Sequence, residues 1–176
     1  MKRRRNMIII LVILSIVLTA SITYVSVSLF TVRVRESRVK IAQGSSALAA
    51  DIIDGDKINK WLSDGVDDEY KRTYTILKHV LDNTPDLKYL YVYQIREGGC
   101  HVVFDFDVDT VEGSHLGDFI EFDDTFLTLK ETLLSGGRID PIESNDSFGW
   151  LITNYEPICD SSGKCVAYAG ADVSMT

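Results

Sequence analysis

Residues 88–107 read Lys-Tyr-Leu-Tyr-Val-Tyr-Gln-Ile-Arg-Glu-Gly-Gly-Cys-His-Val-Val-Phe-Asp-Phe-Asp. Two runs of this stretch, 88–96 and 100–107, are rich in aromatic and β-branched side chains, which favour strands. The turn residues Glu97-Gly98-Gly99 separate them, and Gly in a short connection favours a reversal of the chain. The stretch therefore predicts an antiparallel β-hairpin.

A second hairpin is predicted near the end of the chain. Residues 149–159 and 164–174 have strand composition and flank the turn sequence Asp160-Ser-Ser-Gly163. Because side chains alternate along a strand, Ala167, Ala169 and Ala171 fall on one face. We expect this face of small side chains to pack against a helix and the opposite face to form a pocket.

Helical patterns surround the hairpins. Apolar residues recur at helical spacing over 69–83, which ends at Thr84-Pro85, and over 125–134, which ends at Gly136-Gly137. The order of helices, hairpin, helix, hairpin predicts an α+β fold with one antiparallel sheet of about five strands flanked by helices.

An uncharged run of 24 residues, Met7 to Phe30, precedes this domain. As a helix it spans about 36 Å, enough to cross a hydrocarbon core of roughly 30 Å. We interpret it as an uncleaved membrane anchor, because the run is longer than the apolar region of a signal peptide, which is the main alternative. The predicted organisation is a cytoplasmic basic tail at 1–6, a transmembrane helix at 7–30, a continuing stalk helix at 31–54, and a folded domain at 55–176.

Charge distinguishes the two ends of the chain. Residues 1–40 contain 8 Lys and Arg and one acid, Glu36, whereas residues 41–176 contain 10 Lys and Arg against 25 Asp and Glu. An acidic domain repels phosphate backbones, so nucleic acid is excluded as an expected partner. Lys and Arg are balanced across the membrane run, so the α-amino group and Glu36 alone favour a cytoplasmic amino terminus.

Several segments together resemble the Cache family, the extracytoplasmic PAS-like sensor domains of bacterial receptors. They are the membrane helix running into a long helix, and residues 88–93, 102–107, 116–118, 149–158, 160–164 and 169–175. The resemblance implies a PAS-like sheet, a small-molecule ligand, an extracellular or periplasmic location and signalling without catalysis. It also implies a second membrane helix and an output domain beyond Thr176, so we expect a fragment of a histidine kinase, a diguanylate cyclase or phosphodiesterase, or a chemoreceptor. We further expect a homodimer formed through the stalk helices.

The resemblance also suggests where a ligand binds. Asp172 matches a family aspartate that contacts the ligand amine, and a carboxylate suits an ammonium group. The other expected pocket residues are Tyr91, Tyr93, Asp105, Trp150, Thr153, Tyr155 and Tyr168. The Arg-Trp-Tyr triplet of the family's amino-acid receptors is absent, and Arg138 is its nearest substitute. An amine, a small organic acid and no ligand all stay open.

Carboxylates and thiols offer two further candidate sites. Asp105, Asp107 and Asp109 alternate and are weak candidates for Ca²⁺ or Mg²⁺, but their spacing does not fit an EF-hand. A solvated acidic rim is the alternative. Cys159 and Cys165 flank a turn and form either a disulfide or two thiols.

Catalysis finds no support in the sequence. The three histidines show no metal-ligand spacing, and no nucleophile or phosphate-loop motif is present. We therefore expect no enzyme and no cofactor. The alternatives to a ligand sensor are a divalent-cation sensor and a membrane-anchored structural or assembly protein.

Overall fold

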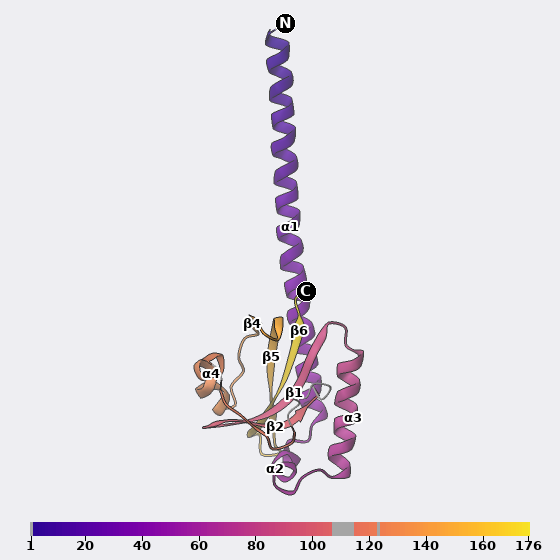
Figure 1. Cartoon of the computed structure of the whole chain (residues 1–176), viewed down its shortest axis with the longest axis vertical. Coiled ribbons are helices and arrows are strands. Elements are labelled where there is room, and N and C mark those ends of the chain that lie inside the picture. Colours follow the sequence, from indigo (N-terminus) through magenta and orange to yellow (C-terminus); the bar gives the residue numbers. More distant parts are fainter. Residues whose placement is uncertain (1, 107–114, 123) are drawn as a thin grey trace. The chain divides into compact units, whose positions relative to one another are not determined.

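A computed structural model describes residues 2–106, 115–122 and 124–176 (Figure 1). The chain divides into two compact units, residues 1–37 and 38–176, and each is described by itself. Helix α1 has the bounds Lys2–Ile52, so its first part belongs to the first unit and its last part to the second.

The first unit is helical, and its run from Met7 to Phe30 is uncharged on all sides. Its large hydrophobic side chains between Met7 and Phe30 range from 49% exposed at Ile9 to 75% exposed at Tyr24. The most apolar window has a mean hydropathy of 2.7 and buries none of its residues. Among the described residues, this is the one helix long and apolar enough to span a bilayer.

Side-chain caps fix the starts of the next two helices. Helix α2 (Gly55–Asp64) begins where the Asp54 side chain accepts a hydrogen bond of 3.0 Å from the Asp56 amide. Helix α3 (Asp68–Asn83) begins where Asp67 accepts one of 2.8 Å from the Tyr70 amide. Such bonds satisfy amide donors that have no partner inside the helix. The helix predicted at 69–83 is confirmed.

Six strands form one antiparallel sheet. The strands are β1 (Leu87–Arg96), β2 (Gly99–Asp105), β3 (Phe119–Ile120), β4 (Ile142–Asp146), β5 (Gly149–Cys159) and β6 (Cys165–Ser174). Their order is β3-β2-β1-β6-β5-β4, so β6, the last strand of the chain, lies in the centre and joins the second predicted hairpin to β1 of the first. Helix α4 (Asp124–Leu134) precedes β4. The predicted α+β fold class, one antiparallel sheet flanked by helices, is confirmed, with two short edge strands, β3 and β4, added to the predicted hairpins.

The sheet has two unlike faces. On the face that we call the α1 face, Ala42 and Ala49 of α1 share one hydrophobic core with the three alternating alanines of β6. Small side chains allow this close packing, and the predicted helix-packing face is confirmed. On the opposite face, which we call the α4 face, Leu133 packs with Tyr155 and Tyr168.

Candidate functional site

A polar cluster lies at the centre of the α4 face. The strand register places Thr153 opposite Asp172, and it places both Tyr155 and Tyr91 opposite Gly170. The four side chains Tyr91, Thr153, Tyr155 and Asp172 therefore come from three neighbouring strands, and we call them the tyrosine–aspartate cluster. The sequence predicted all four as ligand residues.

Asp172 is the charged member of this cluster and is only 9% exposed. Burial raises its pKa to about 6, while hydrogen bonds from the hydroxyls of Thr153 and Tyr91 act in the opposite direction. The Tyr91 hydroxyl lies 3.2 Å from Asp172 Oδ1. Within the described part of the chain, no Lys, Arg or His forms an ion pair with Asp172. A buried carboxylate held by hydroxyl groups is suited to a cationic group brought by a ligand.

The Tyr91 hydroxyl connects Asp172 to Tyr155. It lies 2.9 Å from the Tyr155 hydroxyl as well as near Asp172. A phenol has a single proton, so a Tyr91 that donates to Asp172 must accept its second bond from Tyr155. Burial and the neighbouring carboxylate raise the pKa of Tyr91 well above its ordinary value, which keeps the phenol protonated. The cluster is thus a directional chain of hydrogen bonds that ends on Asp172.

Tyr93 and Asp105 extend the cluster towards the edge of the sheet. The rings of Tyr91 and Tyr93 are 4.6 Å apart, and the Tyr93 hydroxyl donates a hydrogen bond of 3.0 Å to Asp105 Oδ2. Burial raises the pKa of Tyr93, and Asp105 raises it further. Both residues therefore join the predicted site through defined contacts.

Two predicted ligand residues are placed differently. Trp150 is five positions from Tyr155, so strand alternation directs it to the α1 face, where it is 39% exposed and its Nε1 donates to Glu143. Tyr168 is on the α4 face, but its hydroxyl lies 3.0 Å from the Leu133 carbonyl oxygen and 2.9 Å from that of Gly137. Tyr168 therefore anchors the end of α4, and the structure does not bring Trp150 to the cluster.

The remaining expectations concern cations, anions and thiols. Asp107 and Asp109 lie outside the described residues, and the described residues contain no group of three metal-ligating side chains. Arg138 forms an ion pair with Glu156, so its charge is already matched.

Cys159 and Cys165 are Cα partners across β5 and β6, and both are present as thiols. The disulfide stays a prediction.

Helix α4 contributes to the site in a way that the sequence analysis missed. Phe126 packs its ring 5.4 Å from that of Tyr155, edge to face, and Phe122 stacks on Phe126 at 5.9 Å. These rings form an apolar wall beside the hydroxyl groups. The helical spacing of apolar residues within 125–134 was the available signal, but it does not say which strand the helix covers.

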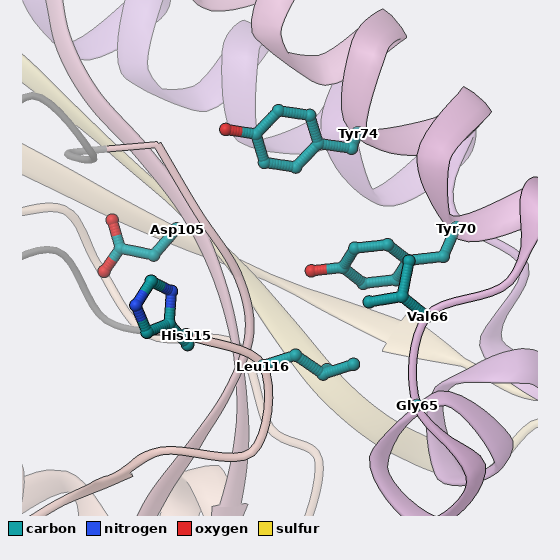
Figure 2. Close-up of a pocket in the computed structure, with 7 residues that line it drawn as sticks. All are labelled: Gly65, Val66, Tyr70, Tyr74, Asp105, His115 and Leu116. Atoms are coloured by element: carbon teal, nitrogen blue, oxygen red, sulfur yellow. The ribbon is translucent and has the colours of Figure 1, made fainter.

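A pocket at the edge of the sheet was also missed. Its volume is about 500 Å³, and its lining residues are Gly65, Val66, Tyr70, Tyr74, Asp105, His115 and Leu116 (Figure 2). They come from the α2–α3 connection, from α3, from the end of β2 and from the segment before β3. No local motif joins these segments, so only the tertiary structure shows the pocket.

Comparisons with known proteins give structural similarity only. The sequence matches no protein-family model and no curated protein. Among solved structures, the ligand-binding domain of the Campylobacter jejuni chemoreceptor Tlp3 in complex with L-valine has a TM-score of 0.48 and 15% identity, covering 85% of this chain and 56% of that chain. An extracellular ligand-binding receptor from Desulfohalobium retbaense has a TM-score of 0.48 and 15% identity, covering 82% of this chain and 24% of that one. The periplasmic sensory domain of the C. jejuni chemoreceptor Tlp1 has a TM-score of 0.45 and 14% identity, with coverages of 84% and 56%. This chain thus spans from about a quarter to just over half of the length of these structures.

Proposed function

We propose that this chain is the extracytoplasmic sensor part of a membrane receptor, and that it binds a small molecule at the tyrosine–aspartate cluster. The observation that carries the proposal is Asp172, a buried carboxylate that hydroxyl groups hold in place and that has no ion-pair partner among the described residues. A ligand ammonium group would supply a positive charge beside the Asp172 carboxylate and would offset the free-energy cost of burying it. The ligand class that fits best is therefore a small amine.

Coupling between this cluster and α1 supports a sensing role. Thr153 and Tyr155 face the cluster, and Asn154 between them points to the opposite face, where its amide donates a hydrogen bond of 2.8 Å to Ser46 Oγ of α1. A ligand that displaces β5 at Thr153 or Tyr155 must also displace Asn154 and its partner on α1. We propose that this motion is passed to the membrane helix of a dimer formed through α1. The dimer would pass it on to an output domain, which is a histidine kinase, a diguanylate cyclase or phosphodiesterase, or a chemoreceptor domain.

The binding part of the proposal is tested by a thermal-shift screen of the full chain in detergent against amines, amino acids, small organic acids and divalent cations. We expect an amine to raise the Tm of the wild type and of the control Asp140→Asn, whose side chain is exposed. The same amine should not raise the Tm of Asp172→Asn. An equal response in Asp172→Asn, or no response to any amine, would overturn the proposed site.

The location is tested through Cys159, which is exposed. On intact cells that express the Cys165→Ser variant, in which Cys159 cannot pair with Cys165, a membrane-impermeant maleimide should label Cys159. It should not label a cysteine introduced at Asn6 in the basic tail, in a background where both Cys159 and Cys165 are serine. Labelling of Asn6→Cys without labelling of Cys159 would reverse the proposed orientation.

A further inference from the structure

The edge pocket has a polar wall and an apolar wall. In Figure 2 the Asp105 carboxylate and the His115 imidazole lie on one side, and the hydroxyl of Tyr74 points towards them from α3. Among the described residues, the Tyr74 hydroxyl has no hydrogen-bond partner. The Asp105 carboxylate is also held by the hydrogen bond that its Oδ2 accepts from Tyr93. This wall therefore offers both a negative charge and a phenol group to a ligand.

Aromatic packing holds in place the two tyrosines of α3 that line the pocket. The Tyr70 hydroxyl donates a hydrogen bond of 2.8 Å to the Val103 carbonyl oxygen, and its ring stacks on Phe104 at 4.4 Å. Tyr74 packs against Phe106 with ring centroids 4.7 Å apart. Two fixed aromatic rings beside a carboxylate are a favourable environment for an organic cation, through the ring quadrupole and the opposite charge.

The charged residues around the pocket also favour a cationic ligand over an anionic one. Residues 41–176 hold 25 Asp and Glu against 10 Lys and Arg, and Asp64 adjoins the lining residues Gly65 and Val66. An acidic surface raises the local concentration of cations and lowers that of anions. An anionic ligand would therefore meet repulsion here both from Asp105 and from the domain as a whole.

We propose that this edge pocket is a second binding site, distinct from the tyrosine–aspartate cluster, and that it takes a small organic cation with an apolar body, such as an arylalkylamine. The ammonium group would lie between Asp105 and Tyr74, and the apolar body would lie against Val66, Leu116 and the Tyr70 ring. The two sites are connected, because Asp105 binds Tyr93, Tyr93 packs against Tyr91, and Tyr91 binds Asp172. Occupation of the pocket is therefore expected to change the environment of Tyr91.

The test measures binding of phenethylammonium to the full chain in detergent by isothermal titration calorimetry, with 2-phenylethanol as its uncharged counterpart. Val66 is 54% exposed on a connection, so Val66→Lys should fold normally and place a repelling cation at the pocket. Ile76→Lys is the matched control, because Ile76 is 50% exposed on α3 and does not line the pocket. We expect Val66→Lys to weaken phenethylammonium binding by about tenfold or more, and Ile76→Lys to leave it unchanged.

Three outcomes would overturn this inference. Binding to Val66→Lys with wild-type affinity would show that the cation does not occupy the pocket. Equal binding of 2-phenylethanol would remove the preference for a cation. Loss of binding in Asp172→Asn with retention in Val66→Lys would place the cation at the tyrosine–aspartate cluster, and would support the proposed function while rejecting the second site. If the second site exists, Asp172→Asn retains phenethylammonium binding and Val66→Lys loses it.

Discussion

The side-chain amide of Asn154 donates a hydrogen bond of 2.8 Å to the hydroxyl oxygen of Ser46, and both residues are buried. The bond joins the sheet to α1 directly behind Thr153 and Tyr155. A helix that slid by one turn along the sheet would bring Ala42 or Ala50 to the position of Ser46 and leave the Asn154 amide without this acceptor. The pair therefore fixes the register of α1 on its face of the sheet.

The first prediction concerns this pair. Ser46→Ala leaves a buried amide without its acceptor and should lower the free energy of unfolding by about 1–3 kcal/mol. Adding Asn154→Leu removes the donor as well and should recover part of the loss. Urea unfolding of the two single variants and of the double variant measures the coupling. Strictly additive losses would show that the bond does not hold the register.

The second prediction follows from the pKa of Asp172, which is raised from 3.8 to about 6. The folded chain therefore binds this proton more tightly than the unfolded chain, so the stabilising contribution of protonated Asp172 is complete below about pH 4 and is lost as the pH rises through about 6. The full shift corresponds to about 3 kcal/mol, of which about 2 kcal/mol is lost between pH 4 and pH 7. The difference in unfolding free energy between wild type and Asp172→Asn, measured across this range, should show that fall. Parallel curves for the two proteins would contradict the raised pKa.

The third prediction isolates the Tyr91 hydroxyl. Tyr91→Phe removes a donor to Asp172, so the pKa of Asp172 should rise further above about 6. The carboxyl carbon of Asp172, followed by ¹³C NMR during a pH titration, reports this change directly. Tyr74→Phe is the control, because the Tyr74 ring packs from α3 against Phe106 rather than on the cluster. An equal shift in both variants would assign the effect to the fold in general.

The sequence predicted the hairpins and the two faces of the sheet because both depend on local alternation. Ala167, Ala169 and Ala171 are two positions apart, and the structure places all three in the core with α1. The same rule shows why Trp150 was misplaced, since an odd separation from Tyr155 puts the two on opposite faces. Strand β4 was missed because Ile142–Asp146 is a short, mostly polar edge strand without an apolar alternation.

The contacts of the candidate site were harder to predict because they depend on register between distant segments. Tyr91 and Asp172 are 81 positions apart, and the pairing of β1 with β6 brings them together. Nothing local in the sequence specifies that pairing. Tyr168 likewise anchors α4 because the carbonyl groups at the end of that helix lie within reach of its hydroxyl. The position of the helix end cannot be predicted from an aromatic residue on a strand.

The fourth prediction tests the packing behind Tyr91. A Cβ atom at Gly170 would overlap the Tyr91 ring, whereas one at Gly98 would meet nothing within 4 Å. Gly170→Ala should therefore destabilise the chain by about 1–3 kcal/mol by displacing the ring, and Gly98→Ala should be close to neutral. Thermal unfolding of both variants provides the comparison. A neutral Gly170→Ala would mean that the ring can move without cost and that the cluster is not rigid.

The fifth prediction concerns the pair Cys159 and Cys165, which are Cα partners at a register shift between β5 and β6. Cys159 is exposed, whereas burial raises the pKa of the Cys165 thiol, so oxidised glutathione should react first at Cys159 and release one glutathione. The Cys165 thiolate then displaces the second glutathione and closes the Cys159–Cys165 disulfide. In Cys165→Ser the second step is impossible, so mass spectrometry should find glutathione retained on Cys159. If the wild type also retains glutathione there, the two sulfur atoms do not come within bonding reach, and the disulfide prediction is wrong.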